Sequence, residues 1–250
     1  MYQQANEHLT KQIRQIFVDS KGIFGAPKIW KELLKLGERC SLKRVQRLMR
    51  KSNLRSKTVR KYRPQGGKKI EGAYKNLLDQ DFSTNTINEK WVSDITYIHT
   101  LKHGWCYLAS VMDLHTRKII GYSFSQKMTT DIVVDALNKA IQSQNPGENV
   151  IVHTDLGSQY TSKEFQEELK KNKMMASFSK RGCPYDNACI ESFHAILKKE
   201  EVYCTHYETF DMARVSLFQY IEAWYNRKRP HGSIGGLTPD AYENICRKAS

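Results

Sequence analysis

Residues 90–124, KWVSDITYIHTLKHGWCYLASVMDLHTRKIIGYSF, decide the fold of this 250-residue chain. They contain three runs rich in β-branched and aromatic residues, at 90–100, 105–113 and 118–124. Such runs are typical of strands. Only four residues separate each run from the next. The segment is therefore predicted to form a three-stranded antiparallel meander.

Helical and strand-like segments alternate after this meander. Apolar residues recur at helical spacing over residues 131–141, 162–173, 187–203 and 210–226. Short apolar runs at 149–154 and 174–179 predict two further strands. Three strands followed by alternating helices and strands predict a mixed α/β sheet covered by helices.

The first 55 residues predict a separate, all-helical domain. We expect helices over residues 9–20, from Pro27 towards a stop at Gly37, and over residues 42–51 after Ser41 as N-cap. The third helix has an apolar face of Leu42, Val45 and Met49, and a separate cationic face of Lys43, Arg47 and Arg50. A short turn between two helices, the second of them cationic, favours a helix-turn-helix. An ordinary helical bundle with a basic face is the alternative.

Positive charge is concentrated in the N-terminal third of the chain. The formal net charge is +14, and residues 1–75 hold 20 Lys and Arg against 5 Asp and Glu. The remaining 175 residues hold 20 against 21. A basic block of this kind favours a nucleic-acid partner over a merely solvated surface or an anionic membrane. Residues 56–75 are basic, contain Pro64, Gly66 and Gly67, and have few apolar residues, so they predict a linker.

The six cysteines and the hydropathy of the chain predict a cytoplasmic protein. No two cysteines form a C-x-x-C pair, so free thiols in a reducing compartment are expected. The segment MYQQANEHLTKQ is polar and lacks the apolar core of a signal peptide. No run of 18 apolar residues occurs, so no membrane span is predicted.

Three carboxylates occupy unusual positions. Asp94 lies among strand-forming residues, where a charge is costly unless it has a partner. Asp155 ends the apolar run 150–152 before a loop, and strand ends facing loops are where α/β sheets place their sites. Glu191 lies in the predicted long helix and shares a stripe with Lys198, apart from the apolar face of that helix.

A metal site would explain all three carboxylates together. Two Asp and one Glu at one point repel one another and raise each other's pKa, and a hard divalent cation removes that conflict. Oxygen ligands alone favour Mg²⁺ or Mn²⁺. Two such ions, about 4 Å apart, are a common device for displacement at phosphorus. Taken singly, each carboxylate has the simpler interpretation of a surface ion pair or a helix cap.

Three motifs of the chain resemble those of OrfB-type transposases of the insertion-sequence-three family, within the DDE transposase and retroviral-integrase superfamily. They are WVSDITY at 91–97, HTDLGSQY at 153–160 and CPYDNACIESF at 183–193. Thirty-five residues separate Asp155 from Glu191, the spacing for which that superfamily is named. Further similarity lies at Lys198 and in residues 24–25, 43–49, 224–226, 229–231 and 238–239.

The resemblance implies both the domains and the chemistry. Residues 88–250 would form a ribonuclease-H-like catalytic domain, with a helix-turn-helix DNA-binding domain at 1–55 and a basic linker at 56–87. Asp94, Asp155 and Glu191 would hold two Mg²⁺ or Mn²⁺ ions, and Lys198 would act beside them. Metal-activated water would nick DNA at transposon ends, and the freed 3′-hydroxyl would attack target DNA.

The resemblance also implies partners. Double-stranded DNA is the substrate, and the expected contacts are Lys43, Arg44, Arg47, Arg50, Lys198 and Arg229. A homo-oligomer in the synaptic complex, the upstream-frame protein or its frameshift fusion, and a nucleoid-associated location in a bacterial cytoplasm are expected too. A DNA-binding regulator with an inactive integrase-like domain and a ribonuclease-H-type nuclease are the alternatives.

Several other residues allow two interpretations. His153 would orient a ligand or pack in the core, and Arg229 and His231 would touch DNA or fix the C-terminal helix. Asp186 and Asn187 are expected to be helix caps. Trp91 and Trp105 are expected in the core.

Overall fold

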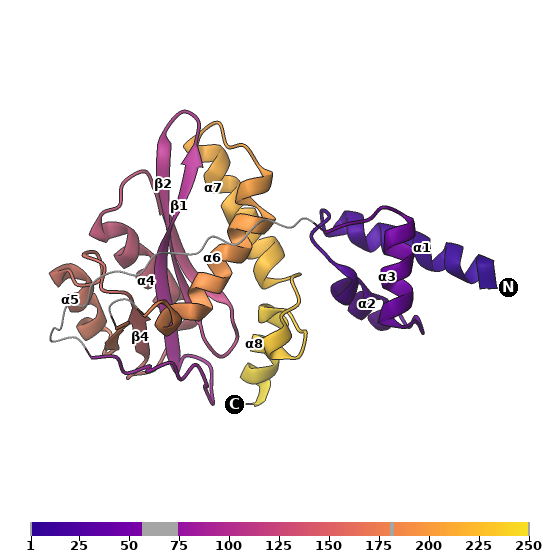
Figure 1. The fold of residues 1–250 in the computed structure, drawn as a ribbon. Coiled ribbons are helices and arrows are strands. Elements are labelled where there is room, and N and C mark those ends of the chain that lie inside the picture. Colours follow the sequence, from indigo (N-terminus) through magenta and orange to yellow (C-terminus); the bar gives the residue numbers. More distant parts are fainter. Residues whose placement is uncertain (1, 57–74, 181–182, 250) are drawn as a thin grey trace. The chain divides into compact units, whose positions relative to one another are not determined.

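The computed structural model describes residues 2–56, 75–180 and 183–249. The chain divides into two compact units, Met1–Tyr62 and Arg63–Ser250 (Figure 1). Most of the predicted linker, residues 57–74, lies outside the described residues.

The first unit is a bundle of three helices. They are α1 (Tyr2–Asp19), α2 (Ala26–Lys35) and α3 (Leu42–Lys51). The bounds of α3 match the prediction, and the Ser41 hydroxyl caps it by accepting the backbone N–H of Arg44. Helix α1 begins earlier than expected, because the polar residues before Leu9 continue the helix. Val45, Leu48 and Met49 of α3 are buried, which fixes the face of α3 that turns inward.

The second unit is built on a five-stranded sheet in the order β3-β2-β1-β4-β5 (Figure 1). Strands β1 (Lys90–Thr100), β2 (Gly104–Asp113) and β3 (Ile119–Ser125) form the predicted antiparallel meander. Strand β4 (Ile151–Thr154) runs parallel to β1, and β5 (Met175–Phe178) runs parallel to β4. The predicted mixed sheet is therefore confirmed.

Helices cover both faces of this sheet. Helices α4 (Thr130–Gln144) and α5 (Lys163–Lys171) pack with Trp91 and Val152 in one apolar cluster. Helices α6 (Ala188–Glu200) and α7 (Phe210–Phe218) pack with Val92 and Ile98 in another. Successive residues of a strand point to opposite faces, so β1 contributes to both clusters.

The C-terminal region differs from the sequence-based expectation. The helix expected to 203 ends at Glu200, and a short 3₁₀ turn, η2 (Val202–Cys204), follows it. The helix expected over 210–226 is α7 continued by the π-helical η3 (Gln219–Asn226). A final helix, α8 (Pro239–Ala249), was not predicted; it follows the 3₁₀ turn η4 (Gly232–Ile234). Sequence periodicity alone does not distinguish the wider π turns from an α-helix.

Residues 75–87 belong to the second unit and not to a linker. Leu78 is only 1% exposed and lies in the cluster under α6. The backbone N–H groups of Leu77 and Leu78 donate to the Ser177 hydroxyl on β5. The expected linker boundary at residue 87 is thus too late, because residues 77 and 78 are bonded to a strand about 100 residues further along the chain.

Two simpler expectations can be checked directly. All six cysteines are free. Among the described residues, no helix combines the length and apolarity that crossing a bilayer requires.

Candidate active site

Asp94 lies in the middle of β1, on the face that α6 covers. It shares that face with Val92 and Ile98, and its side chain is 24% exposed. Its Oδ2 atom lies 3.4 Å from Nδ1 of His194 on α6. Asp94 is thus a partly exposed carboxylate where the central strand β1 meets helix α6.

Asp155 follows β4 directly, beside Asp94. The parallel register pairs Val92 with His153. Continued by two residues, it places residue 155, just after β4, level with residue 94 in the middle of β1. The Oδ1 atom of Asp155 accepts the backbone N–H of Gly157 at 2.9 Å. The side chain is open to solvent on one side, yet the protein around it desolvates it and raises its pKa. The charge of Asp94 raises that pKa further, against the lowering effect of the Gly157 hydrogen bond.

Glu191 and Lys198 on α6 both feel the charge of Asp94. Burial raises the pKa of Glu191, and the charge of Asp94 raises it further. Burial lowers the pKa of Lys198, while Asp94 opposes that shift. Asp94 is therefore the common electrostatic neighbour of Asp155, Glu191 and Lys198.

The chemistry of the residues present fits a divalent cation. The charge of Asp94 raises the pKa of both Asp155 and Glu191, and a bound cation would offset that repulsion. Carboxylate oxygens are the ligands that Mg²⁺ and Mn²⁺ prefer. Within the described residues, no three His, Cys, Asp or Glu side chains are already gathered closely enough to hold an ion. Asp94 thus influences Asp155 and Glu191 electrostatically, but the three carboxylates do not form a chelating cluster in the described part of the chain.

A polar stripe on α6 faces β1, and sequence reasoning found only half of it. Glu191 and Lys198 were recognised as one stripe; Asn187, just before the helix, and His194 complete it at spacings of four and three. His194 is buried, and its Nε2 lies 3.4 Å from the Ser110 hydroxyl on β2. The available signal was its position three residues after Glu191.

The expected capping roles of Asp186 and Asn187 are wrong. Asn187 occupies the N-cap position of α6, but its side chain makes no cap hydrogen bond and donates instead to the Ser93 carbonyl at 3.1 Å. The Asp186 carboxylate accepts from the Lys180 backbone N–H and from the side chains of Asn76 and Gln80. Both side chains therefore fix the start of α6 to neighbouring segments.

His153 is a core residue. Its two ring nitrogens lie 2.8 and 2.9 Å from the hydroxyls of Ser177 and Ser179. Burial lowers its pKa to about 4, with a smaller opposing effect from Asp186. A neutral ring held by two hydroxyls favours the packing interpretation over a ligand-orienting one.

The expected DNA contacts occupy different environments. Lys43, Arg47 and Arg50 are exposed on α3, whereas Arg44 is half-buried and its Nε donates to Asn6 Oδ1 at 2.9 Å. Arg229 is 8% exposed, and its guanidinium donates to both carboxylate oxygens of Glu200. This buried ion pair favours the interpretation that Arg229 fixes the C-terminal region and not the interpretation that it contacts DNA.

The two tryptophans differ. Trp91 is fully buried, as expected. Trp105 is 60% exposed, so the core interpretation is wrong for it. It packs edge-on against Tyr97 and His99 instead.

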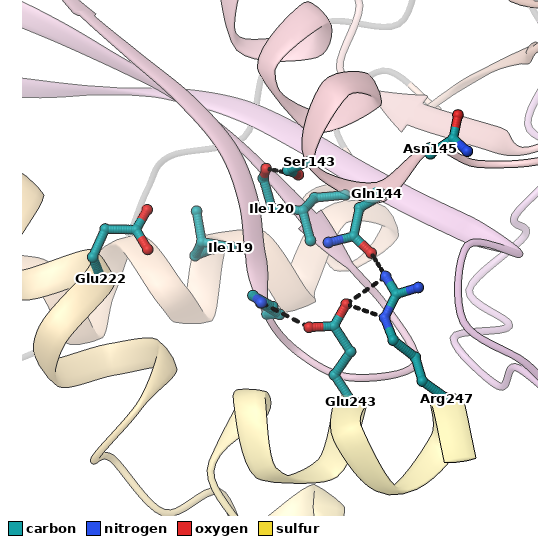
Figure 2. Close-up of a pocket in the computed structure, with 9 residues that line it drawn as sticks. Ile119, Ile120, Ser143, Gln144, Asn145, Glu222, Glu243 and Arg247 are labelled. Carbon is teal, nitrogen blue, oxygen red and sulfur yellow. Dashed lines mark hydrogen bonds and ion pairs between the residues drawn. The ribbon is translucent and has the colours of Figure 1, made fainter. Parts of the chain in front are cut away.

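A pocket of about 460 Å³ lies elsewhere, between β3, the end of α4, η3 and α8. Figure 2 shows Glu243 hydrogen-bonded to Arg247, which is also bonded to Gln144. The amine of Lys118 donates to Glu243 as well. None of the predicted site residues lines this pocket. Its paired charges attach α8 to the sheet.

Comparison with known proteins identifies both units. Family models described as integrase core domain match residues 85–184 and 172–239, and an HTH-like domain model matches residues 4–62. A solved chain from the simian T-cell lymphotropic virus intasome, in complex with PP2A regulatory subunit B56 gamma, is similar with a TM-score of 0.53 and 15% identity. That similarity covers 92% of this chain and 74% of the other, and it supports the ribonuclease-H-like fold alone.

Curated relatives are much closer in sequence. The transposase InsF for insertion sequence IS3A of Escherichia coli is 41% identical over 97% of this chain and 84% of its own length. The transposase for insertion sequence element IS904 of Lactococcus lactis is 39% identical, over 95% of this chain and 94% of its own length. The integrase core implies use of a divalent metal, and both domains indicate DNA binding. The chain therefore belongs to the insertion-sequence-three family of transposases, enzymes with an HTH-like domain and an integrase core.

Proposed function

We propose that this transposase cleaves DNA phosphodiesters at transposon ends and joins the freed 3′-hydroxyl to target DNA. The observation that carries the proposal is the position of Asp94, which acts on the pKa of Asp155, Glu191 and Lys198 alike. Three carboxylates could hold the metal ions and one lysine could contact the phosphate of a phosphodiester bound beside the partly exposed Asp94.

Each residue has a role in this proposal. Asp94, Asp155 and Glu191 supply the oxygens that hold two Mg²⁺ or Mn²⁺ ions. When bound, such ions activate the attacking oxygen and stabilise the leaving one. Lys198, with its amine in the field of Asp94, contacts the phosphate beside the scissile bond. Lys43, Arg47 and Arg50 on the outer side of α3 contact the DNA backbone and bases, and Arg44 supports them.

The test is strand transfer with pre-cut transposon ends in Mg²⁺ and in Mn²⁺. Asp155→Asn and Glu191→Gln are expected to abolish nicking and joining while the fold is retained. Asp135→Asn, an exposed carboxylate on α4, is the matched control and should be unaffected. Undiminished nicking by Asp155→Asn would exclude this active site, and inactive wild-type protein would favour the DNA-binding regulator. Cleavage of RNA–DNA hybrids in place of transposon ends would favour the ribonuclease-H-type nuclease.

We further propose that the chain works as an oligomer and together with the product of the upstream frame. The described part of the first unit is one small bundle of three helices, which offers little surface for a long terminal repeat. In a gel shift, this polypeptide alone is expected to bind a terminal inverted repeat little better than random DNA. Strong preference for the repeat by the isolated chain would contradict this.

A further inference from the structure

His194 bridges two strands directly beneath the candidate active site. Strand β1 places Asp94 opposite Ser110 of β2. The imidazole of His194 lies across this pair, with Nδ1 3.4 Å from Asp94 Oδ2 and Nε2 3.4 Å from Ser110 Oγ. The ring is buried and packs against Phe193 at a centroid distance of 5.4 Å. Its position is therefore set from both strands and from its own helix.

The order Ser110–His194–Asp94 is that of a hydrolytic triad, but the burial excludes that function. Ser110 is 0% exposed on a central strand, so no substrate can reach its hydroxyl. The exposed end of the arrangement is Asp94, at 24%. Whatever the three residues do must therefore act through the Asp94 carboxylate.

The hydrogen-bond chemistry of a neutral imidazole gives this arrangement a direction. One ring nitrogen carries a proton and the other accepts one. A carboxylate only accepts, so the proton belongs on Nδ1, towards Asp94. Nε2 is then free to accept the Ser110 hydroxyl. A ring in this position lies 3.4 Å from Oδ2 of Asp94 and can restrain that oxygen electrostatically.

We propose that His194 is a positioning residue that orients Asp94 for a divalent cation. This rests on the proposed function, because it assumes that Asp94 is a metal ligand. Residues that orient metal-binding carboxylates from behind typically change metal affinity by about 10- to 100-fold when replaced. The position three residues after Glu191 and four before Lys198 places His194 between the two other site residues of α6.

The test is Mn²⁺ binding to the full chain, measured by water-proton relaxation without DNA. His194→Phe keeps the ring and removes both nitrogens, and we expect about tenfold weaker binding. His194→Asn places an amide donor near the position of Nδ1 and should recover most of the affinity. His194→Gln places its amide near Nε2 and should not. His206→Phe, an exposed histidine, is the matched control and should bind as wild type does.

The outcomes separate the inference from the proposed function. Wild-type binding by His194→Phe, together with loss of binding by Asp155→Asn, would overturn the positioning role alone. Equal loss in the Phe and Asn variants would also overturn it, since packing and not the donor would then matter. Unchanged binding in both His194→Phe and Asp155→Asn would overturn the metal site and the inference together. If His194→Phe does not fold, Ser110→Ala removes the other anchor and should weaken binding two- to threefold; unchanged binding would overturn the role.

Discussion

At the scale of single residues, Gly157 lies so close to the Asp155 carboxylate that a side chain at this position would make the carboxylate shift. A Cβ at Gly157 would lie 2.9 Å from Asp155 Oδ1, the atom that accepts the Gly157 N–H. Gly157→Ala is therefore expected to displace the carboxylate and to slow nicking by about 100-fold. Stability should change by less than about 0.5 kcal/mol, because the turn is at the surface.

Gly147→Ala is the control for this prediction, since nothing lies within 4 Å of a Cβ at that position. Nicking rates and thermal unfolding of the two variants are compared side by side. A Gly157→Ala protein that nicks at the wild-type rate would show that Asp155 does not need its observed orientation.

His153 predicts an acid-sensitive stability. Its pKa is lowered to about 4 by burial, whereas an unfolded chain titrates near 6.5. The unfolded state therefore binds a proton first as pH falls, and the free energy of unfolding decreases between about pH 6.5 and pH 4. The stabilisation from the neutral ring is fully present above pH 6.5. At pH 4 the free energy of unfolding is lower by roughly 3 kcal/mol.

Urea unfolding at intervals between pH 7 and pH 4, with the His153 ring followed by NMR, checks this linkage. A His153 ring that titrates near pH 6.5 in the folded protein would contradict it.

At the scale of elements, the pair Arg229–Glu200 joins the end of α6 to the segment after η3. Both side chains are buried, and Glu200 also accepts from the hydroxyl of Tyr220. Arg229→Met leaves the Glu200 carboxylate buried without the guanidinium that neutralises it. We expect the free energy of unfolding to fall by about 3–5 kcal/mol. The double variant with Glu200→Gln should recover much of that loss, because it removes the stranded charge and keeps an acceptor.

Chemical denaturation of the two single variants and the double variant measures this coupling. A soluble, stable Arg229→Met protein with reduced salt-dependent DNA binding would instead favour the DNA-contact interpretation of Arg229.

Helix α4 lies unusually close to β3 at Gly121. A Cβ there would lie 2.3 Å from the Ala136 carbonyl oxygen and 2.5 Å from the Ala140 nitrogen. Gly121→Ala must push the helix backbone away from the sheet, which is expected to destabilise the protein by about 3 kcal/mol. Thermal unfolding tests this, with Gly232→Ala as the control because that position has open space. Equal unfolding temperatures would show that α4 moves freely.

At the scale of the whole molecule, charge and chemistry are divided between the two units. The basic residues are concentrated before residue 76, and the candidate active site lies after residue 90. Replacing Lys43, Arg47 and Arg50 together by Ala should reduce the salt dependence of DNA binding by about three counterions. Strand transfer from saturating pre-cut ends should change much less than binding does.

Lys102, Lys127 and Lys228, all exposed on the second unit, form the matched triple control. DNA affinity measured between 50 and 200 mM salt compares the two triple variants. If both triple variants lose the same amount of salt dependence, the lysines of the second unit contribute as much to DNA contact as the basic residues of α3.

The sequence by itself determined most of the elements and the motifs of this protein, although not α8. The strand β1 and the helix α3 were predicted with their observed bounds, because alternation and helical spacing are local properties. Local pattern does not say which faces meet. Only the tertiary structure decided that Leu78 is core, that Trp105 is exposed, that Arg229 is paired and that His194 lies behind Asp94. Burial and pairing depend on partners far away in the chain, so they follow from the packed fold and not from any one segment.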